Sequence, residues 1–259
     1  MEKLIIDRPS TYAKDREILC IDAVKWLEDL QSDFQGSIFT GLPDLSELLS
    51  IFSGKTLKDK AEQYEAWFLY VLELIFKRLS EGHFAIFYQT DTKVTTSQGL
   101  VVKWIDKSYL CSKVASKYNC ALCWHKIASN YESSIQTNRP RYSHILCFSK
   151  GEIKYHISAF DVPDVIDRGL MNWPNAIGLE ACILCIAFLK YVANSNLIYN
   201  PFCGRGTVVA VANYFGIRCI GIEILPKRCR KCLTKNMSAF IEKIPEDVLQ
   251  RLGVKFIFK

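Results

Sequence analysis

Short apolar runs alternate with longer stretches of helical periodicity along most of the chain. The apolar runs predict strands at Glu17–Asp22, Gly36–Thr40, His83–Thr90, Cys120–Ile127, Tyr142–Ser149, Leu197–Phe202 and Arg218–Ile224. The helical period predicts helices at Ala23–Leu30, Leu57–Leu79, Val101–Lys117, Ala176–Val192, Thr207–Phe215 and Pro226–Ile241. Strands that alternate with helices form a mostly parallel sheet with helices on both faces. The pattern therefore predicts an α/β fold around a seven-stranded sheet.

Two of the predicted strands, Cys120–Ile127 and Tyr142–Ser149, follow one another with no helix between them. A polar loop joins them, which predicts an antiparallel hairpin at the edge of an otherwise parallel sheet. The sequence contains no internal repeat, low-complexity tract or long Gly/Ser linker. We therefore expect one domain over residues 1–259.

The composition is that of an ordinary globular protein, with 49% hydrophobic and 23% charged residues among 259. The N-terminus lacks an apolar run of signal-peptide length, and Glu180 and Lys190 interrupt the most apolar stretch, Ile177–Ala193. These features predict an intracellular protein, cytoplasmic or nuclear, with no membrane partner. The net charge of +6 permits an anionic partner but does not require one.

Six of the eleven cysteines form C-x-x-C pairs, at 120/123, 182/185 and 229/232. Structural zinc sites place such pairs on turns, whereas these lie in predicted helices or in an apolar segment. We interpret them as small buried thiols and expect no metal site, with a zinc site as the alternative.

A candidate ligand-binding turn lies in residues 200–207, NPFCGRGT, between a predicted strand and a predicted helix. Gly204 and Gly206 would let a ligand approach the backbone, and the helix N-terminus would offer free N–H groups. Glu223 ends the next strand, where an acid can accept hydrogen bonds from two ribose hydroxyls. This pattern fits any nucleoside cofactor, including NAD, and the alternative is a tight turn with no ligand.

Residues 200–224, NPFCGRGTVVAVANYFGIRCIGIEI, resemble the cofactor motif of the DNA-amino-methyltransferase (N4/N6-type) superfamily, whose cofactor is S-adenosyl-L-methionine. The family motif reads Asp-Pro-Phe-x-Gly-Ser-Gly-Thr, followed by an alanine-bearing helix and Gly-Ile-Glu. Asn200 replaces the usual aspartate and keeps an acceptor without its charge, and Arg205 replaces the usual serine. The resemblance implies a Rossmann-like methyltransferase fold.

The resemblance extends upstream in a particular order. Residues 17–44 resemble the family's segment that ends in the catalytic Asp-Pro-Pro-Tyr, residues 141–150 its edge strand, and residues 173–183 the helix before the cofactor strand. A catalytic motif that precedes the cofactor motif is the circularly permuted arrangement of that family. It implies a catalytic-motif half, 1–150, and a cofactor-binding half, 151–259.

The family's cofactor site carries over residue by residue. The resemblance implies that Asn200, Phe202, Gly204, Gly206 and Thr207 line the cofactor turn and that Glu223 binds the ribose. It also implies that Asp22 lies near the adenine, that Asn175 and Gly178 lie near the methionine end, and that the methyl group points toward Gly41. Asp22 and Asn175 each have an alternative role as a helix cap.

The catalytic motif departs from the family. When Leu42-Pro43 is aligned with the two prolines, Gly41 takes the acceptor position and Asp44 the aromatic position. Asp44, or else Thr40, can act as acceptor or base from a neighbouring position. The alternative is that Pro43-Asp44 simply begins the next helix. No Pro-Cys pair occurs, which argues against base-carbon methylation through a cysteine adduct.

Basic residues suggest the substrate class. The predicted last helix carries Lys227, Arg228, Arg230, Lys231 and Lys235, and Arg139 and Arg141 flank a polar loop beside Tyr131 and Tyr142. Arginine and aromatic groups together suit nucleic acid, although such a run can also be a solvated face. With no recognition domain, we expect RNA rather than DNA, or a protein partner that supplies recognition. The alternatives are a non-catalytic methyltransferase-like subunit and, disfavoured by the incomplete glycine fingerprint, an NAD-type oxidoreductase.

Overall fold

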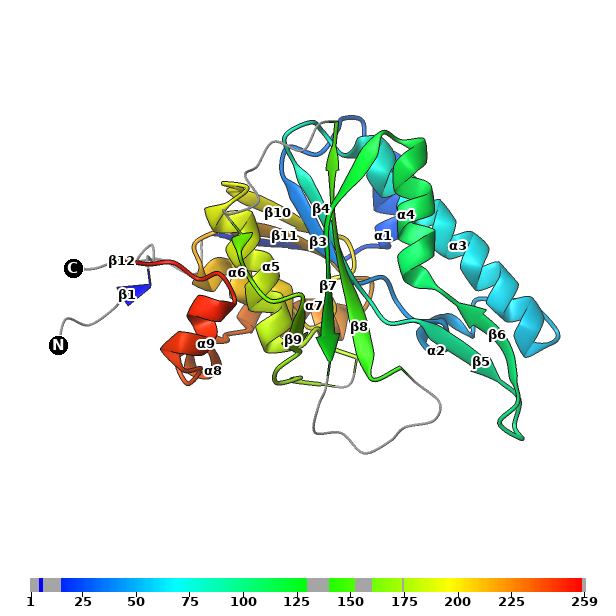
Figure 1. The fold of residues 1–259 in the computed structure, drawn as a ribbon. Helices are drawn as coiled ribbons and strands as arrows, with labels where there is room; N and C mark the ends of the chain where they lie inside the picture. The colour runs from blue at the N-terminus through cyan, green and yellow to red at the C-terminus, as the bar shows by residue number, and fades with distance from the viewer. Residues whose placement is uncertain (1–4, 7–14, 130–139, 152–159, 174, 258–259) are drawn as a thin grey trace.

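The computed structural model describes residues 5–6, 15–129, 140–151, 160–173 and 175–257. A central sheet of eight strands organises these residues (Figure 1). Its order is β2 (Arg16–Leu19), β11 (Arg218–Ile222), β10 (Leu197–Asn200), β3 (Ser37–Thr40), β4 (Phe84–Gln89), β8 (Tyr142–Lys150), β7 (Cys120–Ser129) and β9 (Val165–Asp167). The first five strands are parallel, and β8 is antiparallel to both of its neighbours. The predicted mostly parallel sheet with an antiparallel hairpin is thus confirmed.

One strand of this sheet was not predicted. The strand β9 adds to β7 in parallel, so the hairpin is not the outermost part of the sheet and the sheet has eight strands rather than seven. Three residues, Val165–Asp167, are too few to give a periodic signal in the sequence.

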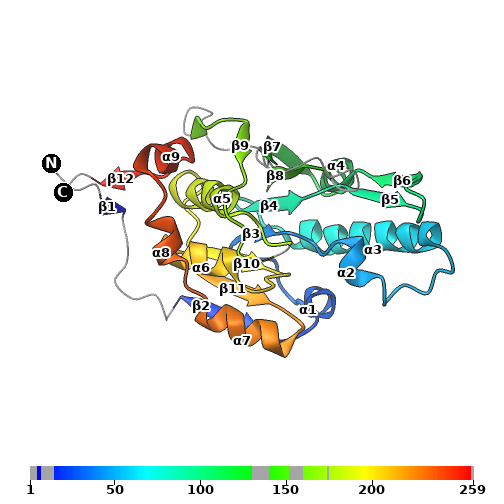
Figure 2. The same ribbon diagram turned by 90° about the horizontal axis from the view of Figure 1, so that it is seen from below.

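Helices cover both faces of the sheet (Figure 2). On one face lie α1 (Ala23–Asp29), α2 (Leu45–Leu48), α3 (Leu57–Arg78) and α4 (Lys107–Lys117). On the other lie α5 (Leu179–Tyr191), α6 (Thr207–Tyr214), α8 (Ser238–Ile241) and α9 (Glu246–Arg251), with α7 (Pro226–Thr234) beside β2 and α6. None of the described helices is long and apolar enough to cross a membrane.

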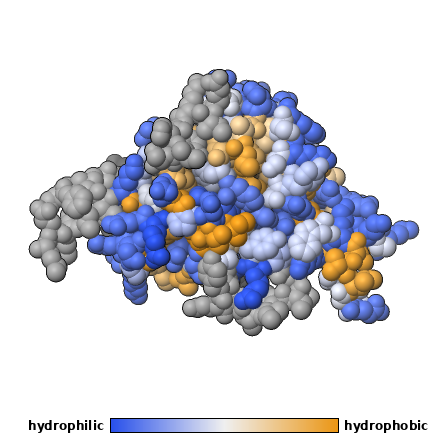
Figure 3. All heavy atoms as spheres, viewed as in Figure 1, coloured by the Kyte–Doolittle hydropathy of each residue, from blue (hydrophilic) through white to orange (hydrophobic). Residues whose placement is uncertain are grey.

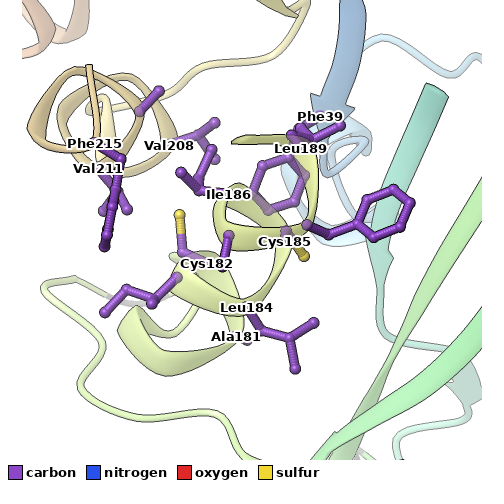
Figure 4. Close-up of a cluster of buried hydrophobic side chains, with 14 of the residues drawn as sticks. Phe39, Ala181, Cys182, Leu184, Cys185, Ile186, Leu189, Val208, Val211 and Phe215 are labelled. Carbon is purple, nitrogen blue, oxygen red and sulfur yellow. The ribbon is translucent and has the colours of Figure 1, made fainter. Parts of the chain in front are cut away.

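The helix α5 is buried on all sides. Every residue from Ala181 to Leu189 is buried between the sheet and α6, and Phe39 of β3 and Val211 of α6 lie in the same cluster of buried side chains (Figure 4). A helix that is apolar on all sides can bury its whole surface away from water only inside a hydrophobic core. This packing fixes the two segments that flank α5, residues 175–178 and the strand β10, and both contribute to the site described below.

Two predicted helices are shorter than expected. The predicted helix Val101–Lys117 begins with a strand, β6 (Val101–Ile105), which pairs with β5 (Thr92–Thr95), and its helical part starts only after the cap at Asp106. The β-branched residues of β6 favour a strand. The predicted basic helix Pro226–Ile241 is two helices, because α7 ends at Thr234 and α8 begins at Ser238.

The β5–β6 hairpin projects from the sheet and carries exposed apolar side chains. Leu100, Val101, Val102 and Trp104 are exposed there, and Figure 3 shows a hydrophobic patch in this region of the surface. A second two-stranded sheet pairs β1 (Ile5–Ile6) with β12 (Phe256–Ile257).

Candidate cofactor and catalytic site

A cavity of about 650 Å³, called here the main cavity, lies where the carboxyl ends of β3, β4, β10 and β11 meet. Ligands of open α/β sheets bind at this edge. The main cavity brings together most of the residues predicted from the sequence: Asp22, Gly41, Asp44, Asn175, Asn200, Phe202, Gly204, Thr207 and Glu223. Thr40, Gly178 and Gly206 are not on its wall. The wall also contains Tyr88, Gln89, Lys107, Arg168 and Trp173, which the sequence did not single out.

Glycine is required at positions 204 and 206 of the 200–207 turn for different structural reasons. Both adopt positive φ, +57° at Gly204 and +82° at Gly206, which favours glycine. A Cβ at Gly204 would lie 3.1 Å from the Trp173 ring, on the cavity wall. A Cβ at Gly206 would lie 2.5 Å from Cys232 Sγ of α7. Packing against α7 is therefore sufficient to require glycine at position 206, and its cofactor role stays a prediction.

Two buried polar atoms beside the turn have no hydrogen-bond partner. Asn200 ends β10 and is 2% exposed, and its Oδ1 accepts no hydrogen bond. Thr207 is the first residue of α6, and its Oγ1 is also without a partner. Buried polar atoms are nearly always satisfied, so these two call for a polar ligand in the main cavity.

Glu223 follows β11 and is 7% exposed on the cavity wall. Its Oε1 accepts a hydrogen bond from Leu225 N at 2.9 Å, and Arg228 Nη1 lies 3.9 Å from its Oε2. The carboxylate is therefore fixed in orientation but still borders the cavity. The Arg228 guanidinium also lies 5.6 Å from the centre of the Trp173 ring, which has Arg205 at 5.1 Å.

The remaining predicted cofactor residues serve the fold as well. Asp22 caps α1, accepting from Val24 N at 2.8 Å and Lys25 N at 3.0 Å, and it also lines the cavity. Asn175 has a positive φ of 67° and is not the cap of α5, because that cap is Gly178. A Cβ at Gly178 would collide with the backbone carbonyl of Arg168. Gly178 thus allows two backbone segments to cross closely, which is a packing role.

The glycine at the acceptor position of the catalytic motif has a steric cause. A Cβ at Gly41 would lie 3.0 Å from the carbonyl oxygen of Tyr88 on the neighbouring strand β4. An acidic side chain at position 41 would push against that backbone. Thr40 is fully buried and its Oγ1 has no partner, but it does not reach the main cavity. The geometry therefore gives no support to the predicted catalytic role of Thr40.

Asp44 lines the main cavity and is held by several groups. Its Oδ1 accepts from Thr92 Oγ1 at 3.0 Å and lies 3.8 Å from Lys107 Nζ. Asp44 is also the N-cap residue of α2, with its own N–H donating to Glu47 Oε2 at 3.2 Å. Asp44 thus begins a short helix and also presents a carboxylate to the cavity, while its catalytic role stays a prediction.

Lys107 is a buried lysine that the sequence did not reveal. It is 1% exposed, and its ammonium group lies 5.5 Å from the centre of the Tyr64 ring and 5.9 Å from that of Phe68. Burial raises the pKa of Tyr64 well above its ordinary value, so the phenol stays protonated and donates to Pro43 O at 2.9 Å. A buried ammonium needs a counter-charge, which Asp44 supplies.

Behind Lys107 lies a chain of polar contacts. Asp91 Oδ1 accepts from Lys107 N at 2.9 Å, its Oδ2 lies 3.4 Å from His144 Nε2, and His144 Nδ1 is 2.9 Å from His125 Nε2. Burial acts to raise the pKa of Asp91, but the hydrogen bonds from His144, Lys107 and Trp104 outweigh it and lower that pKa. This chain fixes the start of α4, and hence Lys107, against the end of β4.

The predicted basic surface is present in part. Lys227, Arg230 and Lys231 of α7 are exposed, while Arg228 turns toward Glu223. Arg141 is exposed beside Tyr142, which borders the main cavity. Arg139 and Tyr131 lie outside the described residues.

The C-x-x-C pairs are distributed over three elements. Cys182 and Cys185 are fully buried in α5, and Cys229 and Cys232 lie on the buried side of α7. Cys120 is buried on β7, whereas Cys123 is half-buried. Among the described residues, no group of three or more His, Cys, Asp or Glu side chains is arranged to hold a metal ion.

Solved structures supply the comparison with known proteins, since no family model and no curated protein matches the sequence. One similar structure is a putative DNA modification methylase from Thermus thermophilus, complexed with S-adenosyl-L-methionine (14% identity; 93% of this chain and 96% of that chain; TM-score 0.61). Another is PvuII DNA methyltransferase, cytosine-N4-specific (14% identity; 94% of both chains; TM-score 0.62). A third is M1.HpyAVI (14% identity; 84% of this chain and 96% of that chain; TM-score 0.53).

This chain has the Rossmann-like methyltransferase fold. The comparisons cover nearly all of it at TM-scores above 0.5, while the identity of 14% supports a shared fold rather than a shared substrate. In the sheet, β10 with the 200–207 turn lies beside β3 with the 41–44 motif, although β3 comes first along the chain. Circular permutation relative to other methyltransferases stays a prediction.

Proposed function

We propose that this chain is an S-adenosyl-L-methionine-dependent methyltransferase that acts on nucleic acid. One observation carries the proposal. The main cavity has the unpartnered acceptor of Asn200, the unpartnered hydroxyl of Thr207 and the carboxylate of Glu223 on its wall. These groups lie at or just after the carboxyl ends of two adjacent strands, β10 and β11, at the edge where a nucleoside cofactor binds in this class of fold.

The residues present fit S-adenosyl-L-methionine. Glu223 can accept from the two ribose hydroxyls, and Asn200 Oδ1 can accept from the cationic amino group of the methionine part. The N-terminus of α6 at Thr207 can bind the methionine carboxylate, because its N–H groups point at that edge. Phe202, Gly204, Asp22 and Asn175 complete the wall, and Gly206 and Gly178 hold its backbone in place. When bound, the cofactor supplies an electrophilic methyl group.

Asp44 is the proposed catalytic residue. Its carboxylate can accept a hydrogen bond from the N–H group that receives the methyl, orient the nitrogen lone pair and take the released proton. Thr92 and Lys107 fix the direction of this carboxylate. Gly41 leaves the cofactor side of the motif without a side chain, so the approach to the methyl group is open.

The nucleic-acid part of the proposal rests on charge and aromatic groups around the main cavity. The exposed cations of α7 follow Glu223 along the chain, and the exposed Arg141 precedes Tyr142, which lines the main cavity. The sequence favoured RNA over DNA, and a protein partner, on the ground that no recognition domain is visible. The comparisons do not support that preference, since the similar structures are named as DNA methylases. The substrate class therefore stays nucleic acid, and both polymers enter the test.

The alternative proposal is a non-catalytic methyltransferase-like subunit, favoured by glycine in place of the acceptor at position 41. The Asp44→Asn variant separates the two. In an enzyme it should lower methyl transfer by about 100-fold or more, because it removes the proton acceptor. The exposed Asp33→Asn is the matched control and should leave the rate unchanged. Cofactor binding without methyl transfer to any RNA or DNA would favour the subunit.

Calorimetry with S-adenosylhomocysteine tests the cofactor. The wild type should bind it, and Glu223→Ala should weaken binding by about 10- to 100-fold, because hydrogen bonds to a charged group are lost. Glu17→Ala, at an exposed carboxylate on the neighbouring strand β2, should bind as the wild type does. Binding of NAD in preference to S-adenosylhomocysteine would instead identify an oxidoreductase. Total RNA, duplex DNA and single-stranded DNA then serve as methyl acceptors.

A further inference from the structure

The last residue of β4, Gln89, is a buried amide on the wall of the main cavity. It is 2% exposed, and its Nε2 has no hydrogen-bond partner. An unsatisfied amide donor inside a protein is rare and destabilising, so an unexplained one at a cavity wall points to a ligand.

The polar groups around Gln89 are engaged with one another. His144 is the residue directly opposite Gln89 on β8, and its two ring nitrogens face Asp91 and His125. Asp91 accepts from Lys107 N and Trp104 Nε1, and the Oδ1 of Asp44 accepts from Thr92. These side chains thus form their hydrogen bonds with one another and do not use the Nε2 group of Gln89.

The strand register sets Gln89 near the proposed catalytic carboxylate. β4 lies directly beside β3, and Gln89 continues β4 two residues past Phe87, the partner of Thr40. Asp44 follows β3, and Gln89 and Asp44 both line the main cavity, as does Lys107, the ion-pair partner of Asp44. One wall therefore presents a hydrogen-bond acceptor at Asp44 and a donor at Gln89.

We propose that Gln89 is a specificity-determining residue that donates a hydrogen bond from Nε2 to the ring nitrogen next to the amine held by Asp44. This inference rests on the proposed function. An exocyclic amine beside an unprotonated ring nitrogen is the donor–acceptor edge of cytosine (N4 and N3) and of adenine (N6 and N1). Uracil and thymine carry a protonated ring nitrogen at the corresponding position, so Gln89 and Asp44 together select an amino-nucleobase.

The test combines a variant with an altered substrate. Gln89→Met keeps the length of the side chain and removes the donor. Oligonucleotides that contain 3-deazacytosine or 1-deazaadenine keep the amine and lose the ring acceptor. With the unmodified base, Gln89→Met should lower kcat/KM by about 10- to 100-fold, and the wild type should lose a similar factor on the deaza base. The variant should lose nothing further on the deaza base, because the same hydrogen bond is already absent.

Gln35→Leu, at an exposed glutamine outside the cavity, is the matched control for the variant. The cytosine and adenine arms identify the base. Full activity of Gln89→Met would overturn the role of Gln89, and so would losses of kcat/KM from the variant and from the deaza base that multiply when the two are combined. The proposed function would still stand in either case if the wild type binds S-adenosylhomocysteine and transfers methyl groups. Absence of methyl transfer to every RNA and DNA would overturn both proposals.

Discussion

Lys107 Nζ lies 3.8 Å from Asp44 Oδ1, with the rings of Tyr64 and Phe68 around the lysine. The ammonium group is almost fully buried, while Asp44 borders the main cavity. Two aromatic faces and the Asp44 carboxylate surround an ammonium group that has little access to water, so removal of either charge is costly. The Asp44 side chain thus belongs to a structural ion pair and is also the proposed catalytic carboxylate.

Lys107→Met should reduce both stability and methyl transfer. Methionine keeps the apolar stem against the two rings but leaves the carboxylate without its counter-charge, so we expect a loss of about 1–3 kcal/mol in the free energy of unfolding. Urea denaturation measures this loss. The exposed Lys58→Met, near the start of α3, is the control and should change the free energy by less than about 0.5 kcal/mol. Wild-type stability of Lys107→Met would show that the pair contributes nothing.

Gly206→Ala should destabilise the protein more than Gly99→Ala. Both glycines have nearly the same φ, +82° and +83°, so the backbone penalty of about 1–2 kcal/mol is shared. A Cβ at Gly99 meets nothing within 4 Å, whereas one at Gly206 meets Cys232 Sγ at 2.5 Å. The clash should add about 1–3 kcal/mol. Thermal unfolding of the two variants compares them directly, and equal melting temperatures would contradict a packing role for Gly206.

Stability should fall as the pH is lowered through the range in which histidine titrates. Burial, and next the charge of His144, lower the pKa of His125 in the folded protein. A depressed folded pKa means that the unfolded chain binds the proton more readily, so the stabilisation is present above the ordinary histidine pKa of about 6.5 and is lost below it.

His125→Gln tests this pH dependence. Glutamine does not titrate, so the melting temperature of the variant should fall less than that of the wild type between about pH 8 and pH 5.5. Burial also lowers the pKa of His83, which is remote from His144 on the chain and keeps its own contribution in the variant. If His125→Gln showed the same fall in melting temperature as the wild type, other groups would account for the whole pH dependence.

Charge reversal on α7 should weaken nucleic-acid binding. Each of Arg230→Glu and Lys231→Glu replaces an exposed cation. If each contacts a phosphate, the slope of log K against log salt should become shallower by about 0.7–0.9 per residue. Titration of a labelled oligonucleotide at several salt concentrations measures the slope. Lys113→Glu, on α4 at the other face of the sheet, is the control, and a reduction equal to that of the α7 variants would indicate an effect of net charge alone.

Much of the sheet could be predicted because its strands are continuous apolar runs, such as Ile38–Thr40 and Phe84–Tyr88, which are buried on both faces. The short strand β9 escaped prediction because three residues carry no period. The β6 strand was read as helix because it runs directly into the cap of α4, and local pattern does not reveal that β5 pairs with it.

The candidate site could also be predicted only in part. The 200–207 turn and Glu223 follow strands in sequence, so a motif can find them. Lys107 and Gln89 meet Asp44 only through the fold, and neither residue belongs to a motif. The reason for glycine at position 41 is a contact across two strands with Tyr88, which no linear pattern contains.

The order of the strands also has a consequence for how the chain is made. β2 comes early in the chain and pairs only with β11 among the described strands, while β10 fills the gap between β11 and β3. A nascent chain that has emerged as far as β8 therefore exposes both edges of β2 and one edge of β3. The sheet closes only after residue 222 has left the ribosome, and the main cavity forms in the same step. Synthesis thus passes through a long interval of unpaired strands, in which slow elongation or a truncated product favours aggregation.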